Sequence, residues 1–122
     1  MKIISQTTVL DAADLTASSS FWAGFFGGTV NADDDWHDVL GPDGVRRLAI
    51  QLAPDHVQPT WPSNEVPQQV HLDFYVEDWK AAHDEVLALG GRHVEASVDP
   101  SQPRGFQVYA DPAGHLFCLC WG

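Results

Sequence analysis

Hydrophobic and polar residues follow two different periods along the chain. In the stretch Val70–Val76 they alternate, which predicts a strand with one apolar and one polar face, because successive side chains of a strand point to opposite sides. Elsewhere apolar residues recur every three or four positions, which predicts helices from Asp14 to Phe26 and from Asp78 to Leu89. The residues expected to be buried under these helices are Trp22, Phe25, Val86 and Leu89.

The same order of signals occurs twice. Each half has an extended run, an aspartate suited to capping a helix, a helical stretch and a pair of glycines suited to ending it. Asp14 and Asp78 are 64 residues apart, and so are Gly27 and Gly91. Matching turns that start at Gly41 and Asp111 follow at an offset of 70. We therefore expect one domain, 1–122, built from two superposable modules, about 1–66 and about 67–122.

Short strand-like runs follow each predicted helix and are separated by Gly, Pro and Asp, so that each module has the order βαβββ. The stretch Pro54–Gln69 contains four prolines and is expected to connect the modules. The expected strands are Ile3–Ala12, Trp36–Leu40, Arg47–Leu52, Val70–Val76, Arg92–Ser97, Phe106–Ala110 and Leu116–Trp121.

Composition and charge exclude several classes of protein. The chain has 122 residues, 44% of them hydrophobic, which suits one folded domain rather than a disordered segment. Its net charge of −11 repels nucleic acid. No apolar stretch approaches the ~20 residues of a membrane span, and the N-terminus lacks a signal-peptide core, so we expect a cytoplasmic protein. Cys118 and Cys120 share one face of a predicted strand and are poorly placed for a disulfide, which fits a reducing compartment.

Three local motifs resemble those of a known superfamily. His71–Asp78 is a strand that runs into a helix cap, Ala110–Leu119 is a turn followed by a last strand, and Phe21-Trp22 lies on the first helix. Together with the tandem repeat, they resemble the vicinal oxygen chelate superfamily, which includes glyoxalase I, extradiol dioxygenases and bleomycin-resistance proteins, and in particular its small glyoxalase-like branch. The resemblance implies an α+β fold in which the two modules form a half-open barrel, with the helices outside and a ligand cup inside.

The enzymes of that superfamily hold a divalent metal with one residue from the first and one from the last strand of each module. By resemblance, these positions fall on Thr7 (or Gln6, if the register slips by one), Gln51, His71 and Cys118. Both expected carboxylates are missing, so that a site for iron, nickel or manganese would lose most of its charge neutralisation. We therefore expect no metal and no cofactor. A zinc site on His71 and Cys118 stays open as an alternative.

Strand alternation places a set of polar residues in the expected cup. Two of them, Asp11 and Asp73, are acidic, and their buried charge calls for a cation or a network of hydrogen bonds. Trp36 and Trp61 have no role in packing a predicted helix, and either can line a ligand pocket. The sequence does not decide on which face of its strand Trp36 lies. The candidate cup residues are Thr7, Asp11, Trp36, Gln51, His71, Asp73, Tyr75 and Cys118, with Cys120 beside them.

Two further groups of residues are expected to lie in solvent. Asp33, Asp34 and Asp35 with Asp38 lack the spacing of a calcium loop and are interpreted as a solvated turn. The histidines other than His71 lack metal-site spacing and are also expected to face solvent; they are His37, His56, His83, His93 and His115.

The leading functional hypothesis is a metal-independent small-molecule binding protein whose cup takes an aromatic or cationic ligand, as the resemblance to bleomycin-resistance proteins implies. The alternative is a glyoxalase-like lyase or isomerase that uses a divalent metal, or His71 or Asp73 as general base. No catalytic residue is assigned. We expect a homodimer, and in a third hypothesis dimerisation is the main role.

Overall fold

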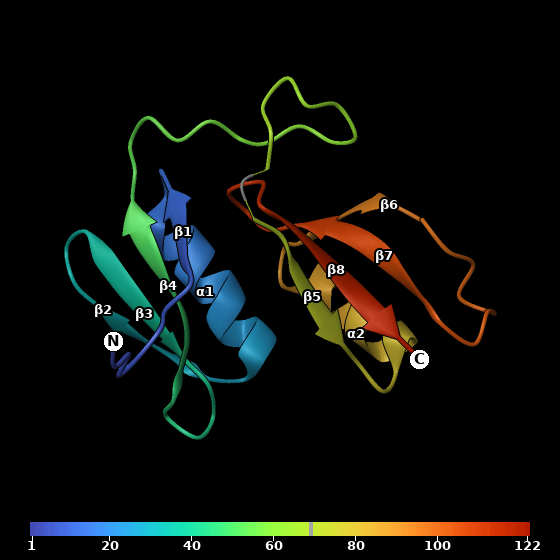
Figure 1. Cartoon of the computed structure of the whole chain (residues 1–122), viewed down its shortest axis with the longest axis horizontal. Helices are drawn as coiled ribbons and strands as arrows, with labels where there is room; N and C mark the ends of the chain where they lie inside the picture. Colours follow the sequence, from blue (N-terminus) through green and yellow to red (C-terminus); the bar gives the residue numbers. More distant parts are fainter. Residues whose placement is uncertain (69) are drawn as a thin grey trace. The chain divides into compact units, whose positions relative to one another are not determined.

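The computed structural model describes residues 1–68 and 70–122, and they form two compact units, Met1–His56 and Val57–Gly122. Each unit has one helix and one four-stranded sheet, so the predicted α+β class is confirmed (Figure 1). The segment expected to be a connector belongs from Val57 onwards to the second unit. The pairing of the modules into a half-open barrel stays a prediction.

In the first unit the strand order is β1-β4-β3-β2. The edge strand β1 runs parallel to β4, and the other pairs are antiparallel. The elements are β1 (Val9–Ala12), α1 (Leu15–Phe26), β2 (Thr29–Ala32), β3 (Trp36–Leu40) and β4 (Arg46–Leu52).

The second unit repeats this topology with the order β5-β8-β7-β6, again with one parallel pair, β5 with β8. The elements are β5 (Leu72–Tyr75), α2 (Trp79–Ala88), β6 (Arg92–Glu95), β7 (Gly105–Ala110) and β8 (Leu116–Trp121). The predicted βαβββ order is therefore present in both halves of the chain.

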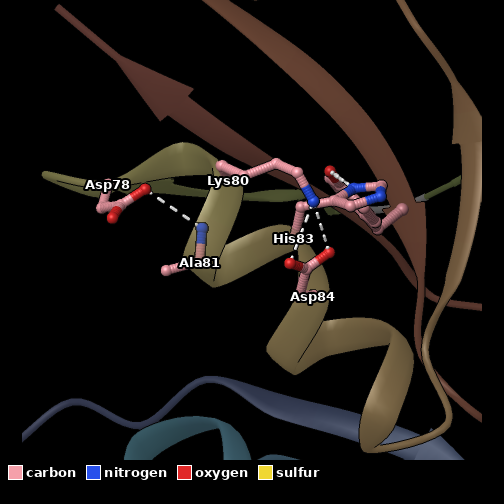
Figure 2. Close-up of polar contacts among 6 residues, drawn as sticks. Asp78, Lys80, Ala81, His83 and Asp84 are labelled. Carbon is pink, nitrogen blue, oxygen red and sulfur yellow. Dashed lines mark hydrogen bonds and ion pairs between the residues drawn. The ribbon is translucent and has the colours of Figure 1, made fainter.

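Both helices begin at the predicted aspartates. The Ala17 amide donates to Asp14 Oδ1 at 3.0 Å. The Ala81 amide donates to Asp78 Oδ1 at 3.1 Å (Figure 2). Each carboxylate therefore satisfies one free N–H group of the first turn of its helix. In α2, Lys80 also pairs with Asp84 one turn later, at 2.9 Å.

The predicted equivalence of Gly27 and Gly91 is wrong by one residue. The left-handed residues after the helices are Gly27, with φ of 69°, and Gly90, with φ of 98°. Each is followed by a glycine whose amide bonds back into the last turn: Gly28 to the Ala23 carbonyl and Gly91 to the Val86 carbonyl. The repeat shortens by one position because α2 ends at Ala88, earlier in its module than α1 does.

Each core lies between a helix and its sheet. In the first unit Trp22 is 1% exposed and packs edge-on against Phe21, and in the second unit Val86 is 2% exposed. The prediction that Leu89 is buried is wrong, since it caps the end of α2 and is 38% exposed. Phe25 is only partly buried.

The first strand is shorter than predicted. The parallel register aligns Val9 with Ala49, and β4 begins at Arg46, so residues before about Gln6 have no neighbouring strand to bond to. Ile3 and Ile4 are accordingly exposed. The strand β2 was not predicted, because its four residues give too short a pattern. Among the described residues, neither helix has the length and apolarity that crossing a membrane requires.

Candidate functional site

The second unit has a concave pocket of about 590 Å³ on the sheet face that points away from α2. Strands β5, β8 and β7 form its floor. Most of its surface is apolar or aromatic, as is usual for pockets that bind small molecules. Its lining residues are Trp61, Gln68, His71, Asp73, Tyr75, Val98, Arg104, Gly105, Phe106, Val108, Leu116, Cys118, Cys120, Trp121 and Gly122.

Strand alternation places the polar side chains of β5 in this pocket. His71, Asp73 and Tyr75 line it, whereas Phe74 lies on the helix side of the sheet and contacts the ring of Phe117. Across the parallel pair, Asp73 aligns with Cys118. Four of the eight predicted cup residues are thus brought together: His71, Asp73, Tyr75 and Cys118.

Asp73 is the electrostatic centre of this group. Its Oδ1 lies 3.5 Å from His71 Nε2, and both side chains are close to half exposed. Burial, followed by the charge of Asp73 and its hydrogen bond to the thiol, raises the pKa of Cys118 to about 12. Burial and Asp73 also raise the pKa of Cys120. Both cysteines are therefore neutral thiols at pH 7, and neither is an activated nucleophile.

Aromatic side chains form the walls of the pocket. Trp61 Nε1 donates to Glu95 Oε2 at 3.1 Å, and Trp121 Nε1 donates to the Gln102 carbonyl at 2.9 Å. Both indoles thus have their polar atom satisfied while their rings line the cavity. Phe106 lines it as well and is 41% exposed. The sequence had marked Trp61 as a possible wall without assigning it to the site.

Among the lining residues that the sequence analysis did not name, Val98, Arg104 and Gly105 come before or at the start of β7. Val98 and Arg104 lie in an irregular segment without periodic signal, and Gly105 begins the strand. A side chain at Gly105 would collide with Val98 Cγ1 at 2.5 Å and with Trp121 Cζ2 at 2.8 Å. The glycine therefore lets the segment pack closely against β8. One sequence signal indicates this wall: residues two apart on a strand share a face, so Phe106 lies on the same face of β7 as Val108.

The other four candidates belong to the first unit. Gln51 on β4 aligns with Asp11 on β1 and with Trp36 on β3, so these three form one row across the sheet. Their face points away from α1, because His37, the next residue after Trp36, is buried on the opposite side and lies 2.7 Å from Ser19 of that helix. Trp36 therefore lies on the face of β3 that points away from α1, which the sequence had left undecided.

Thr7 precedes β1 and is held by an arginine. Arg46 donates a hydrogen bond to the Thr7 hydroxyl and pairs with Asp38 at 3.4 Å. Trp36 Nε1 also donates to Asp38 Oδ1, at 2.9 Å. A cationic guanidinium therefore occupies the neighbourhood of the residue that resemblance offers as a metal ligand.

The positions expected to hold a divalent metal fit one poorly. Thr7 bonds a cation, and Cys118 is a neutral thiol. The registers also separate Gln51 from its supposed counterpart Cys118. Cys118 aligns with Asp73, and the equivalent pair in the first unit is Ala49 with Val9. Gln51 aligns with Asp11 instead, two residues further along β4 than Ala49. Within residues 1–68 and 70–122, no three His, Cys, Asp or Glu side chains are grouped suitably for a metal ion.

The expectation that the remaining histidines face solvent is wrong for His37, His83 and His93, of which His93 is partly buried and stacks on the ring of Tyr109. His37 is 8% exposed in the first core. His83 Nδ1 lies 2.7 Å from the Tyr109 hydroxyl, and its ring is 5.1 Å from that of His93. These histidines lie on the helix sides of the sheets, outside the pocket. By contrast, Asp33, Asp34 and Asp35 are exposed between β2 and β3, as predicted. The prediction is wrong for Asp38, which is half-buried on β3 and is held there by Arg46 and Trp36.

Comparison with known proteins gives one family. A model described as a glyoxalase-like domain matches residues 7–120. No curated protein matches the chain.

Solved structures share the fold at low identity. The fosfomycin resistance protein FosX from Listeria monocytogenes is 17% identical with a TM-score of 0.71, over 100% of this chain and 95% of that one. A glyoxalase/bleomycin resistance protein from Albidiferax ferrireducens is 16% identical with a TM-score of 0.67, over 98% and 99%. A glyoxalase/bleomycin resistance protein/dioxygenase family enzyme from Burkholderia phytofirmans is 12% identical with a TM-score of 0.70, over 94% and 95%.

Proposed function

The chain belongs to the glyoxalase-like domain family of the vicinal oxygen chelate superfamily, and from this we propose that it binds an aromatic, cationic small molecule in the pocket of its second unit without a metal. The observation that carries the proposal is the partly exposed Asp73 carboxylate within an aromatic-walled cavity of about 590 Å³. A carboxylate beside indole and phenyl rings offers both ionic and cation–π contacts.

The polar groups around Asp73 support binding more than nucleophilic chemistry. The neighbouring Cys118 thiol, with its pKa of about 12, supplies no thiolate. Arg46 takes up the Thr7 hydroxyl, so the first unit offers no free oxygen at that position for a metal. A cationic ligand bound in the pocket is therefore the simplest partner for the negative charge of Asp73.

A second candidate function rests on the His71 and Asp73 pair. Their 3.5 Å separation and half-exposed side chains suit a carboxylate that orients an imidazole, which then removes a proton from a bound carbon acid. This lyase or isomerase activity needs the same pocket. Replacement of His71 by Gln separates the two functions, because it abolishes proton removal but leaves the carboxylate that binds a cation.

Fluorescence titration with matched cationic and neutral aromatic compounds tests the proposal, since Trp61 and Trp121 line the pocket and report on it. Hydrogen bonds to charged groups contribute about 1.5 to 3 kcal/mol, so Asp73→Asn is expected to weaken cation binding roughly tenfold or more. The control Asp34→Asn, in the exposed turn, leaves affinity unchanged. Equal losses from both variants, or equal affinity for neutral and cationic compounds, would refute the cationic ligand.

We also propose that the protein acts in the cytoplasm as a homodimer. Sedimentation equilibrium measures the dimer directly, and a monomer at micromolar concentration contradicts it.

A further inference from the structure

The pocket contains one basic residue, Arg104, that pairs with no acidic group in the described parts of the chain. By contrast, Arg46, Arg47 and Lys80 each pair with an aspartate. Acidic residues outnumber Lys and Arg by 17 to 6, so partners are abundant for most basic groups. A guanidinium without one, at the wall of a cavity, is available to an anionic group of a ligand.

Hydrogen bonds hold the segment that carries Arg104 against the sheet. Gln107 Nε2 of β7 donates to the Val98 carbonyl at 2.8 Å, and Trp121 of β8 donates to the Gln102 carbonyl at 2.9 Å. Gln107 is 1% exposed, so its bond to the segment is shielded from water. Arg104 follows Gln102 by two residues and directly precedes β7, so its backbone is anchored on both sides.

The sheet register separates Arg104 from Asp73. Asp73 aligns with Cys118, and Cys118 aligns with Val108, which places Asp73 two strands away from β7. Arg104 lies four residues before Val108. With about 4.8 Å between strands and about 3.4 Å per residue, the two backbone positions are on the order of 16 Å apart. The next row between them is Tyr75, Cys120 and Phe106, so the space that separates the two charges is apolar and aromatic.

Resting on the proposed function, we infer that the ligand is an elongated zwitterion: its cationic end lies at Asp73, its aromatic body on the middle row, and a carboxylate at Arg104. Arg104 is then a specificity-determining residue. The planar guanidinium binds a carboxylate through two parallel N–H···O hydrogen bonds, which a lysine cannot reproduce.

Three probes built on one rigid biphenyl test this inference by titration calorimetry. One carries a para-aminomethyl group, one a para-carboxylate, and the third carries both groups at opposite ends. The protein is expected to bind the zwitterion about tenfold tighter than the cation. Arg104→Gln is expected to remove this difference, whereas Arg104→Lys restores part of it. The matched control is Arg92→Gln, an exposed position on β6 outside the pocket lining.

The outcomes separate this inference from the function it rests on. If the cation binds and Asp73→Asn weakens it, but the zwitterion binds no tighter or Arg104→Gln changes neither probe, the zwitterion is refuted and the cationic ligand stands. If the carboxylate probe alone binds as tightly as the zwitterion, the two-ended ligand is also refuted. If none of the three probes binds, the proposed function fails together with the inference.

Discussion

Asp73 and Cys118 align across the parallel strands β5 and β8, and both side chains line the pocket. Burial and this acidic neighbour together raise the pKa of the thiol to about 12. The pairing keeps a sulfur that could react in its protonated form while the carboxylate stays partly exposed to the pocket. The reactivity of Cys118 therefore depends on its burial first and on the charge at position 73 second.

Asp73→Asn is expected to lower the pKa of Cys118, because it removes the charge that disfavours a neighbouring thiolate. Each unit of decrease raises the thiolate fraction near pH 9 about tenfold. Alkylation by iodoacetamide, followed by mass spectrometry of the peptide that contains both cysteines, measures the rate, with Cys120→Ser as background to isolate Cys118. Unchanged alkylation in the Asn variant would show that burial alone protects the thiol.

Addition of nickel, zinc, iron or manganese is expected to leave the melting temperature nearly unchanged. A ligand present at a hundred times its dissociation constant adds about 2.7 kcal/mol of stability, enough to move the midpoint by several degrees. Differential scanning calorimetry of chelator-treated protein measures this. The prediction is contradicted if one of these metals clearly raises the melting temperature and His71→Ala abolishes this increase. A metal-dependent activity would then be favoured.

Gly105→Ala is expected to destabilise the protein by about 1 to 3 kcal/mol. The added methyl would lie 2.5 Å from Val98 Cγ1 and 2.8 Å from Trp121 Cζ2, so the pocket wall must move. Gly24→Ala is the matched control, because Gly24 is exposed inside α1, where alanine is favoured by roughly 0.5 to 1 kcal/mol. Urea unfolding compares the two, and equal effects would argue against close packing at Gly105.

The strand faces and helix starts could be predicted because they follow from local pattern. Alternation alone assigned Asp73 to the polar face of its strand, and the side-chain chemistry of aspartate identified Asp14 and Asp78 as caps. Trp61 and Arg104 could not be assigned in this way. Their positions depend on hydrogen bonds between distant residues, such as that of the Trp61 indole to Glu95, which leave no periodic trace in the sequence.

The prediction that these histidines face solvent was wrong for a related reason. Whether a helix face is buried depends on what packs against it, and the sequence of the helix alone does not show this. His83 lies on α2 among charged neighbours, Lys80 and Asp84, and appears polar in sequence (Figure 2). Its ring nevertheless lies against Tyr109 of β7 and His93 of β6. Gln107 donates to Val98, so its oxygen accepts from His93 Nε2 at 2.6 Å. The helix side of this sheet therefore carries a connected layer of polar side chains, made of His83, His93, Gln107 and Tyr109.

This layer is expected to make the second unit less stable in mild acid. Burial, and next the neighbouring His93, lower the pKa of His83 below its ordinary value of 6.5, with Lys80 acting in the same direction and Asp84 opposing it. The unfolded chain then takes up protons before the folded chain does. The stabilisation is fully present above pH 6.5 and is lost as pH falls through the lowered pKa of His83.

His83→Gln removes this titration while a side chain that can bond the Tyr109 hydroxyl remains. The free energy of unfolding in urea is measured at several values of pH between 8 and 4.5, about two units to either side of the ordinary histidine value. The wild-type protein is expected to lose more stability over this range than the variant. His115→Gln, in the turn before β8, serves as the control for replacing a histidine of the same unit outside this layer. Parallel curves for wild type and His83→Gln would mean that His83 titrates alike in the folded and unfolded chain, and would remove the acid sensitivity assigned to this layer.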